Sequence, residues 1–342
     1  MQMKRIRQVG KFRGFEIFKN YQIIYAVIII FVFALLFVPN FATLRNLTSL
    51  SLQVTDLLII ALGVTFTVLN GGLDFSATSI LALSSIVGAY IMALSPMGGS
   101  LLAIPVAIVV MVLLGGLVGT INGFSVTWLK MPSFIVTLSM QLVVSGVAIY
   151  ISSQVSTMAS IANLPTAFNH IGGNRYFFIP IIIAAAVFFF TDWLITRNIF
   201  GRYVLYVGSN PRTANISGIK VRRTIFMLFL LSGLYAGMQS ILLTARNNAG
   251  ISSLGSRVFI DVMAAIIIGG TSIFGGKGGA RNTLLGVIFI VIIGNIMNLY
   301  GLDWFVATLV KGIIIILAAL LDILTTRLEV IRSARSAQAG DN

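Results

Sequence analysis

The chain alternates between long apolar segments and short polar ones. An α-helix needs roughly 20 apolar residues to cross the hydrocarbon core of a bilayer, and ten segments come close to that length. They are residues 21–38, 50–69, 75–94, 101–128, 132–152, 177–196, 224–245, 258–274, 281–299 and 303–322. The pattern therefore predicts an all-α polytopic membrane protein, with about ten transmembrane helices in a single domain over residues 21–322.

Some of these segments differ from a simple span. The fourth is long and contains Pro105, which predicts a tilted or kinked helix. The second and the eighth contain acidic residues and the eighth is short, so that either can be continuous, broken or re-entrant. The first follows a basic segment but has no small-residue cleavage site after it, which predicts an uncleaved span rather than a signal peptide.

The composition agrees with a membrane protein and excludes several kinds of chemistry. Hydrophobic residues make up 58% of the chain and charged residues 9%, whereas a soluble domain is typically about 25% charged. The chain has no cysteine and one histidine, His170, in a predicted outer loop. We therefore expect no disulfide, no metal site, no cofactor bound by this chain and no enzymatic activity of its own.

The basic residues predict the orientation of the spans. If residues 1–20 lie in the cytoplasm and the spans alternate, the inner segments hold 18 basic residues and the outer segments hold 4. Cytoplasmic loops carry an excess of Lys and Arg, so both termini are predicted to be cytoplasmic. The loop 197–223 and the tail 323–342 then face the cytoplasm as well. The net charge of +14 thus reflects topology and does not predict binding of nucleic acid.

Two loops stand out. Residues 153–176 form the largest outer segment, which is either a solvated connector or a docking site for an external partner. Residues 197–223 form the longest polar interruption, with six basic residues and no acidic one. Within it Asn210 is suited to cap a helix, Pro211 fits the first helical position, and Gly218 supplies a left-handed residue that ends the helix. A helix of about seven residues is marginal alone, so we expect it to pack against its own chain or a partner.

Two further polar interruptions have a structural and a functional interpretation. Residues 70–79 (NGGLDFSATS) form either a tight turn at the membrane edge, where Asp74 or Ser76 caps the next helix, or an irregular segment whose backbone faces a polar solute. In residues 115–138, a glycine recurs every four residues from Gly115, which makes one helix face flat and favours close packing. Asn122 lies nearly on that face and can form a hydrogen bond across helices.

Residues 259–286 contain a glycine-rich run around Lys277. A phosphate-binding loop would need glycine at position 271 and Ser or Thr at position 278, where the chain has Thr271 and Gly278, and it would follow a strand. No nucleotide site is therefore expected in this chain. We expect the glycines to allow a tight cytoplasmic turn between two close-packed helices.

Acidic residues at membrane depth are costly and indicate function by default. The candidates are Asp56, Asp261, Asp192 and Asp322. One interpretation is proton or cation coupling, or a hydrogen bond to a polar substrate. The other is structural, because Asp261 is four residues from Arg257 and Asp192 is followed by Arg197, so that each acid can pair with a base.

Five collinear segments together resemble the permease subunit of bacterial carbohydrate-uptake ABC transporters of the ribose, xylose and autoinducer-2 type. They are VLNGGLDFSATSILALSSIVGA, INGFSVTWLKMPSFIVTLSM, FGRYVLYVGSNPRTANISGIKVRR, SGLYAG and FIDVMAAIIIGGTSIFGGKGGARNTLLG, and they extend over roughly residues 45–320. One departure is Ala77-Thr78, where the family usually has Val-Gly. Because of this difference, it is open whether a turn at residues 77–78 needs a glycine.

The resemblance implies a fold similar to type II ABC importer permeases, in the bacterial plasma (inner) membrane. It implies uptake of a monosaccharide or a similar small polar solute by alternating access. The partners would be a second permease copy or a paralogue, an extracytoplasmic sugar-binding protein, and a cytoplasmic ABC ATPase that binds ATP and magnesium and hydrolyses the ATP.

The resemblance also places functional residues. The ATPase-coupling motif falls on Gly201, Gly208, Asn210, Ala214, Gly218 and Ile219. We expect the substrate path to be lined by Asn70, Asp74, Phe75, Asn122 and Phe134.

Two other functions stay open. A secondary transporter would be driven by an ion gradient through Asp56 and Asp261. A permease of the same ABC type for branched-chain amino acids would need charged groups for a zwitterion, and the sequence offers no obvious pair of opposite charges at the midplane.

Overall fold

The computed structural model describes residues 22–100, 102–155, 160–256, 258–303, 305–314, 316–317 and 320. The predicted cytoplasmic segments 1–20 and 323–342 lie outside these residues, as does Asp322. The elements are α2 (Gln22–Phe37), α3 (Leu44–Leu69), α4 (Ser76–Ala93), α5 (Ala103–Thr127), α6 (Ser133–Val155), β1 (Ser160–Ala162), α7 (Thr166–Asn169), η1 (His170–Gly172), α8 (Phe178–Thr196), α9 (Ile199–Ser209), α10 (Pro211–Ile216), α11 (Val221–Asn247), β2 (Ala249–Ile251), α12 (Val258–Ile268) and α13 (Ala280–Leu299). A further apolar helix follows at Phe305–Ile314.

Among the described residues, seven helices are long and apolar enough to cross a membrane. They are α3, α4, α5, α6, α8, α11 and α13, and they coincide with seven of the ten predicted spans. At the other three predicted spans lie shorter apolar helices, namely α2, α12 and Phe305–Ile314. The number of ten spans and the side of each terminus therefore stay predictions.

The two acid-containing spans differ from one another. The first of them, α3, is one unbroken helix of 26 residues. The other, α12, has 11 residues and at 1.5 Å per residue extends about 16 Å, roughly half of the hydrocarbon core. It ends at Ile268 rather than near residue 274. Pro105 lies in the first turn of α5, where the N–H groups have no helical partner, so no kink is required.

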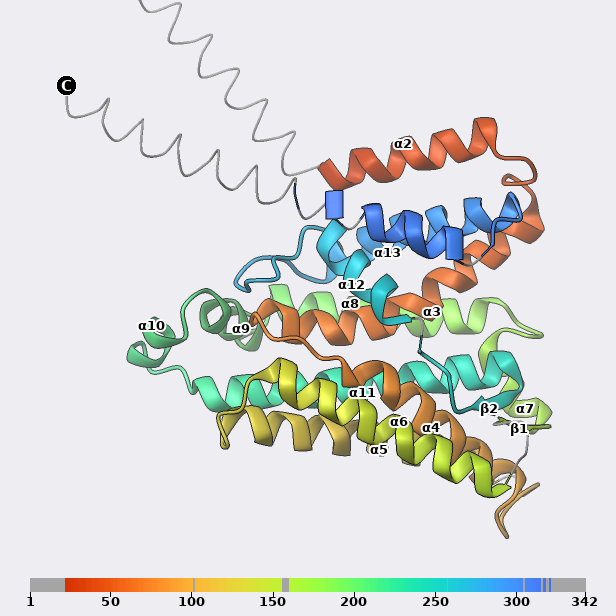
Figure 1. The fold of residues 1–342 in the computed structure, drawn as a ribbon, viewed down its shortest axis with the longest axis horizontal. Helices are drawn as coiled ribbons and strands as arrows, with labels where there is room; N and C mark the ends of the chain where they lie inside the picture. The colour runs from red at the N-terminus through yellow and green to blue at the C-terminus, as the bar shows by residue number, and fades with distance from the viewer. Residues whose placement is uncertain are drawn as a thin grey trace, which may run out of the picture.

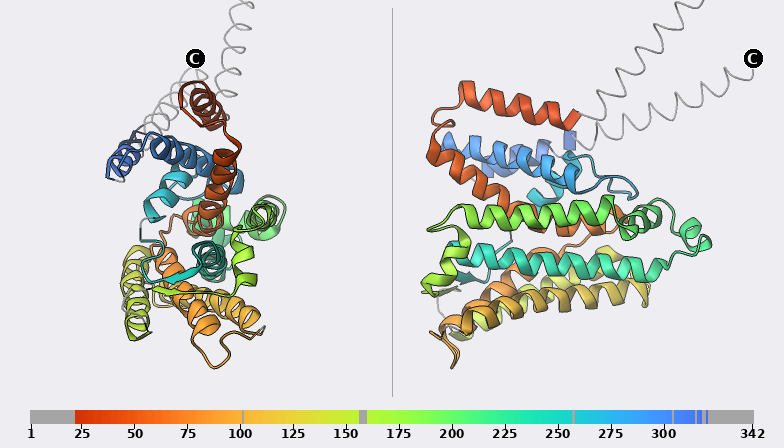
Figure 2. Two further views of the ribbon diagram at one scale, coloured as in Figure 1. Left: turned by 90° about the vertical axis from the view of Figure 1, so that its right-hand side faces the viewer. Right: turned by 180° about the vertical axis from the view of Figure 1, so that it is seen from behind.

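The helix α11 is the centre of the bundle and packs on α5, α3 and α4. In Figures 1 and 2 it runs between α8 and α5. The flat face predicted for α5 is confirmed, because a Cβ atom on Gly115 or Gly119 would lie less than 3.0 Å from a carbonyl oxygen of α11. Backbones can approach this closely only without side chains between them, which favours association where lipid supplies no hydrophobic force.

The two ends of the bundle are built differently (Figure 1). At one end, α9 and α10 project beyond the long helices. At the opposite end, β1 pairs antiparallel with β2, and Ile161, Leu164 and Phe168 are buried against the bundle. The described part of the outer segment 153–176 is thus anchored on the bundle by these side chains, while residues such as Ala162, Asn163 and Asn174 stay exposed. Whether it is a connector or a docking site stays a prediction.

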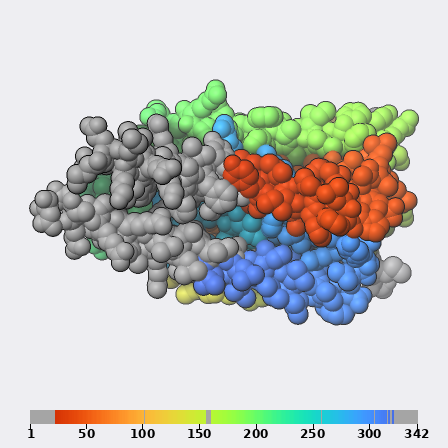
Figure 3. Space-filling model, turned by 90° about the horizontal axis from the view of Figure 1, so that it is seen from above, coloured from red at the N-terminus to blue at the C-terminus, as the bar shows by residue number. Residues whose placement is uncertain are grey.

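On another side of the bundle, α2 packs along α13 (Figure 3). Ala34 and Val38 are buried there with Ile292. Nearby, α13 is joined to α3 by a reciprocal amide pair, in which Asn46 and Asn295 each donate from Nδ2 to the other's Oδ1, at 3.0 and 2.9 Å. Both side chains are buried, and a buried polar group is costly without a partner, so the pair fixes how the two helices align.

Replacing Asn295 with leucine leaves the Asn46 amide buried without this partner. We expect a loss of about 1–3 kcal/mol in the free energy of unfolding, measured as a lower midpoint of thermal unfolding of the purified permease. The double variant Asn46→Leu/Asn295→Leu removes both polar groups and is expected to regain part of that loss. If the double variant lost as much as the two single variants together, the pair would not be coupled.

Candidate functional site

The short helix α10 has the ends that the sequence predicts. It has six residues, and the Asn210 side-chain oxygen accepts hydrogen bonds from the backbone N–H groups of Arg212 and Thr213, at 3.0 and 3.1 Å. Pro211 takes the first helical position. Gly218 follows with a φ of +82°, in open space. The cap, the proline and the left-handed glycine are therefore confirmed.

One face of α10 packs against its own chain. Ala214 and Ile219 are buried with Val207 of α9, and Ile225 of α11 packs against them. Ile216 is on the other face and is 87% exposed. Since a six-residue helix depends on packing for its stability, the buried face holds α10 on α9 and α11 and leaves the Ile216 face uncovered.

The helix α9 connects α10 to the rest of the bundle. A Cβ atom on Gly208 would lie 2.7 Å from the backbone nitrogen of Gly276 and closer still to the carbonyl oxygen of Leu69. The N–H of Gly276 donates to that same oxygen of Leu69 at 2.8 Å. We call this contact of Leu69, Gly208 and Gly276 the glycine junction. Gly201 likewise packs on the carbonyl of Ile195.

The loop 269–279 contributes Gly276 to the glycine junction. In the described chain a helix, α12, and not a strand precedes the loop. A Cβ atom on Gly286 of α13 would lie less than 3.0 Å from the backbone of Ala265 in α12. The predicted tight turn between two close-packed helices is therefore confirmed.

A wide cavity of about 1210 Å³ lies beside α10. Its charged lining residues are all basic: Lys130, Arg212, Lys220, Arg222 and Arg223. Trp128, at the end of α5, also lines it. A cavity wall of one charge attracts an acidic surface, so this region is suited to an acidic partner.

Two of the predicted path residues meet in a buried polar cluster. Asp74 accepts hydrogen bonds from the Ser76 hydroxyl (2.6 Å), the Ser76 N–H (3.0 Å) and the Ser232 hydroxyl (2.7 Å). Asn122 donates to the Ser76 hydroxyl at 2.7 Å. Burial raises the pKa of the Asp74 carboxyl above its usual value, and the hydrogen bonds oppose that rise. The cluster ties α4 to α5 and α11, and it confirms the predicted interhelical bond of Asn122. The N-cap position of α4 is Phe75, whereas Asp74, one residue earlier, accepts from the N–H of Ser76, the first residue of the helix.

The other predicted path residues lie outside this cluster. Phe75 stacks on Phe259 with ring centroids 4.3 Å apart and meets Phe134 edge to face at 5.5 Å. Phe134 is 49% exposed, whereas Asp74 and Asn122 are fully buried. The buried side-chain oxygen of Asn70 accepts no hydrogen bond from the described residues. The five residues therefore form no single lining, and their role in a path stays a prediction.

The departure at Ala77-Thr78 needs no glycine. Both residues lie in the first turn of α4 and are buried. Gly255 packs closely on the carbonyl oxygen of Thr78. The glycine that this close contact requires is therefore Gly255, and no glycine is needed at position 77 or 78.

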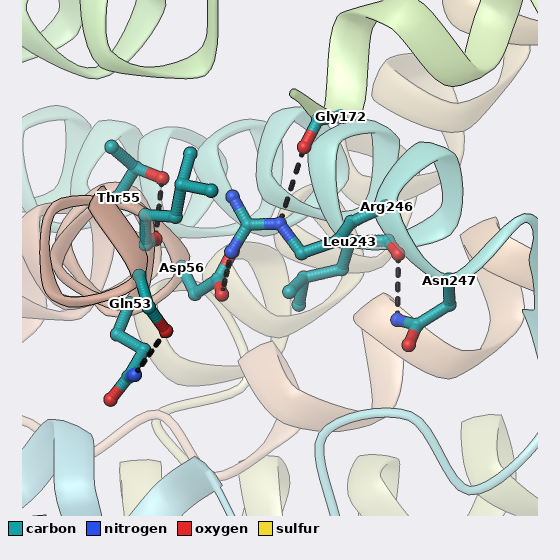
Figure 4. A network of polar contacts seen from close by, with 9 residues as sticks. Gln53, Thr55, Asp56, Gly172, Leu243, Arg246 and Asn247 are labelled. Atoms are coloured by element: carbon teal, nitrogen blue, oxygen red, sulfur yellow. Dashed lines mark hydrogen bonds and ion pairs between the residues drawn. The ribbon is translucent and has the colours of Figure 1, made fainter. Parts of the chain in front are cut away.

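Three of the four acids predicted at membrane depth, Asp56, Asp192 and Asp261, each pair with a base among the described residues. Asp56 of α3 pairs with Arg246 at the end of α11, and Arg246 also donates to the carbonyl of Gly172 at 3.2 Å (Figure 4). Asp261 pairs with Lys311 at 2.9 Å; Arg257 lies outside the described residues. Both pairs join helices that are distant in the sequence. Whether either pair lies at the midplane of the membrane stays open.

Asp192 of α8 pairs with Arg281 of α13 at 2.9 Å rather than with Arg197. The helix α9 was not predicted as a separate helix. Asn198 caps α9 by accepting from the N–H of Phe200 at 2.9 Å. That cap, followed by apolar residues at 199, 200, 204 and 207, is the signal that could have indicated it.

The described chain is thus a bundle of long apolar helices with a polar cluster inside and a capped helix projecting from one end. Residues 46–319 match the family described as branched-chain amino acid transport system / permease component. The chain belongs to this family, and it is therefore a transport subunit of the inner membrane. No solved structure shows significant similarity to it.

Several permeases are similar to this protein over most of the chain. The ribose import permease protein of Escherichia coli (strain K12) is 30% identical over 83% of this chain and 87% of its own length. The ribose import permease protein of Bacillus subtilis (strain 168) is 33% identical over 83% of this chain and 86% of its own. The D-allose transport system permease protein of Escherichia coli (strain K12) is 32% identical over 88% of this chain and 90% of its own.

Proposed function

We propose that this chain is the membrane-spanning subunit of an ATP-driven importer for a monosaccharide. The observation that carries the proposal is α10, a capped helix that projects from the bundle and leaves one face, with Ile216, uncovered. The relatives named as ribose and D-allose permeases support the substrate class. The bundle would take up the sugar by opening alternately to the two sides of the membrane.

The uncovered face of α10 is the proposed contact for a separate cytoplasmic ATPase. We assign the binding of ATP and magnesium to that partner. The glycine-rich run at residues 269–279 lacks the residues of a phosphate-binding loop and forms a turn between two helices. The basic cavity beside α10 favours an acidic surface on the ATPase. A sugar-binding protein on the outer side and a second permease chain, identical or paralogous, complete the proposed assembly.

The proposed coupling passes through the glycine junction. A displacement of α10 moves α9 and α11, on which Ala214 and Ile219 are packed. Gly208 of α9 abuts the end of α3 and the loop before α13 without an intervening side chain. Such close-packed backbone contacts transmit displacements with little slack. The predicted coupling residues Asn210 and Gly218 would set the position of α10 itself.

Replacing Gly218 with leucine tests this coupling. A non-glycine residue at φ +82° is strained by about 1–2 kcal/mol, enough to change the population of the docking geometry about tenfold. We therefore expect sugar-stimulated ATP hydrolysis of the reconstituted importer to fall about tenfold or more, with normal amounts of permease in the membrane. Gly218→Asn is expected to retain more stimulation, because Asn tolerates this conformation.

Gly301→Leu is the matched control. Gly301 has a φ of +66° and also lies in open space, but it follows α13 at the other end of the bundle. The control should keep near-normal stimulation. Near-normal stimulation in Gly218→Leu would instead reject α10 as the coupling element.

The energy source is tested by uptake into vesicles that contain ATP but have no proton or sodium gradient. Uptake that persists supports the ABC importer. Uptake that ignores ATP and collapses with an ionophore would favour a secondary transporter that uses Asp56 and Asp261. Both acids already pair with a base, which leaves no uncompensated carboxylate at either position for a coupling ion.

A further inference from the structure

A cavity between α3, α11, α12, α13 and the helix Phe305–Ile314 contains charged side chains that the proposed coupling does not use. Its volume is about 210 Å³, and Gln53, Asp56, Asp261 and Lys311 form its polar wall. Gln53 and Asp56 project from neighbouring turns of α3 (Figure 4). The rest of the wall is apolar, as at Leu57, Val258 and Val291.

The charges around this cavity cancel. The Lys311 ammonium donates to both carboxylate oxygens of Asp261, each at 2.9 Å. Asp56 is paired with Arg246. Counted with Arg246, which does not line the cavity, the two acids and two bases leave no net charge that would select a cation or an anion. The cavity therefore suits a solute that is polar and neutral.

Stability alone does not explain these pairs. Replacing even a fully buried ion pair with apolar residues is often neutral or stabilising, so apolar residues could also hold the helix Phe305–Ile314 on α12. Ionisable side chains inside membrane proteins typically line substrate pathways or water-filled cavities. The side chains of Asp56, Asp261 and Lys311 are 25%, 28% and 18% exposed, so a solute in the cavity can reach them.

The wall offers both donors and acceptors. Lys311 has three ammonium protons, and its bonds to Asp261 leave one of them for a ligand. The carboxylates keep further lone pairs, and Gln53 donates to Ser49 at 3.0 Å while its carbonyl oxygen stays an acceptor. A sugar ring matches such a wall, because its hydroxyls donate and accept while its C–H faces contact apolar side chains. The cavity volume of about 210 Å³ is smaller than the range of about 300–1,000 Å³ that is typical for drug-sized ligands. A single sugar ring is smaller than such a ligand and suits a cavity of this size.

We propose that this cavity is a weak binding site for the ring of a neutral monosaccharide during its passage through the permease. The inference rests on the proposed function, since it assigns a place in the path to the sugar that the importer carries. It also gives Asp56 and Asp261 a role as hydrogen-bonding groups rather than as ion-coupling groups.

The absence of cysteine from the chain permits a direct test, because an introduced cysteine is its single thiol. Val258→Cys places the thiol in the apolar wall, and Ser253→Cys, on an exposed position five residues earlier, serves as the control. The importer with its ATPase and binding protein is reconstituted in vesicles and treated with a small water-soluble maleimide. The added solutes are ribose, allose, galactose and arabinose, with sucrose and leucine for comparison.

We expect at least one monosaccharide to slow labelling of Val258→Cys in a saturable way, by about threefold at twice the half-protecting concentration, as mass action requires. Labelling of Ser253→Cys should be unaffected, and sucrose should not protect either thiol. Adding Asp261→Asn and Lys311→Gln should raise the half-protecting concentration about tenfold or more, since hydrogen bonds to charged groups are lost. Asp192→Asn with Arg281→Gln, an ion pair that does not line the cavity, should leave it unchanged.

Three results would overturn the proposal: equal slowing by sucrose, protection by leucine and by no sugar, or protection that survives loss of Asp261 and Lys311. ATP-driven sugar uptake is measured on the same vesicles. Uptake without protection rejects this cavity and leaves the proposed function standing. Protection without ATP-driven uptake supports the cavity and rejects the ATP-driven importer.

Discussion

Replacing Arg246 with leucine is expected to lower the free energy of unfolding by about 1–3 kcal/mol, because it leaves a partly buried carboxylate without its partner. Arg246 is the base that pairs with Asp56 across α11 and α3, and it also holds the carbonyl of Gly172. Without it, the Asp56 carboxylate stays among apolar helices with no counter-charge. The measurement is the thermal unfolding midpoint and the yield of folded permease after extraction in mild detergent.

Three further variants separate the pair from a general effect of lost charge. Asp56→Leu/Arg246→Leu removes both charges and should be more stable than Arg246→Leu alone. Arg246→Lys keeps the charge and should lose less. Arg45→Leu removes an exposed arginine at the start of α3 and should change stability by no more than about 0.5 kcal/mol. A double variant as unstable as Arg246→Leu would show that the pairing does not matter.

Replacing Gly119 with leucine is expected to prevent α5 and α11 from packing. The new Cβ atom would lie less than 3.0 Å from the carbonyl oxygen of Phe229, which is backbone and cannot move aside. Overpacking of this kind costs about 1–3 kcal/mol when side chains can adjust, and more is expected here because two backbones must separate. The variant should yield little folded permease, as judged by size-exclusion chromatography of the detergent extract.

Gly146→Leu provides the comparison for Gly119→Leu. Gly146 also lies inside a long apolar helix, α6, but a Cβ atom there would meet nothing within 4 Å. The two variants add the same side chain and differ only in the space around it. Equal yields from both would show that the glycine face of α5 does not hold the bundle together.

The parts of the structure that local rules govern could be predicted. The cap by Asn210, the proline at position 211 and the left-handed Gly218 define α10 within nine residues. The spacing of Gly115 and Gly119 predicts a close approach because both glycines must lie on one helix face. Apolar length predicts the seven long helices, since backbone polar groups in lipid are satisfied within a helix.

The partners of these elements could not be predicted, because the sequence does not say which helices are neighbours. Asp261 has Arg257 four residues away, yet its carboxylate pairs with Lys311, 50 residues later. The pairing of β1 with β2 was not predicted, because each strand has three residues, which are too few to show an alternating pattern of apolar and polar residues. The path residues were chosen by polarity and aromatic character, and these properties do not distinguish the buried Asp74 from the exposed Phe134.

The separation of Asp56 from Arg246 bears on how the protein is made. Arg246 lies 190 residues after Asp56 in the chain, so α3 enters the bilayer before its counter-charge has been synthesised. An acid at the centre of a membrane helix costs about 2.5–3.5 kcal/mol on insertion, while each Leu, Ile, Phe or Val returns about 0.3–0.6. The apolar run from Leu57 to Leu69 can offset that cost. We therefore expect α3 to insert into the membrane first, and the Asp56–Arg246 pair to form only after α11 has been inserted.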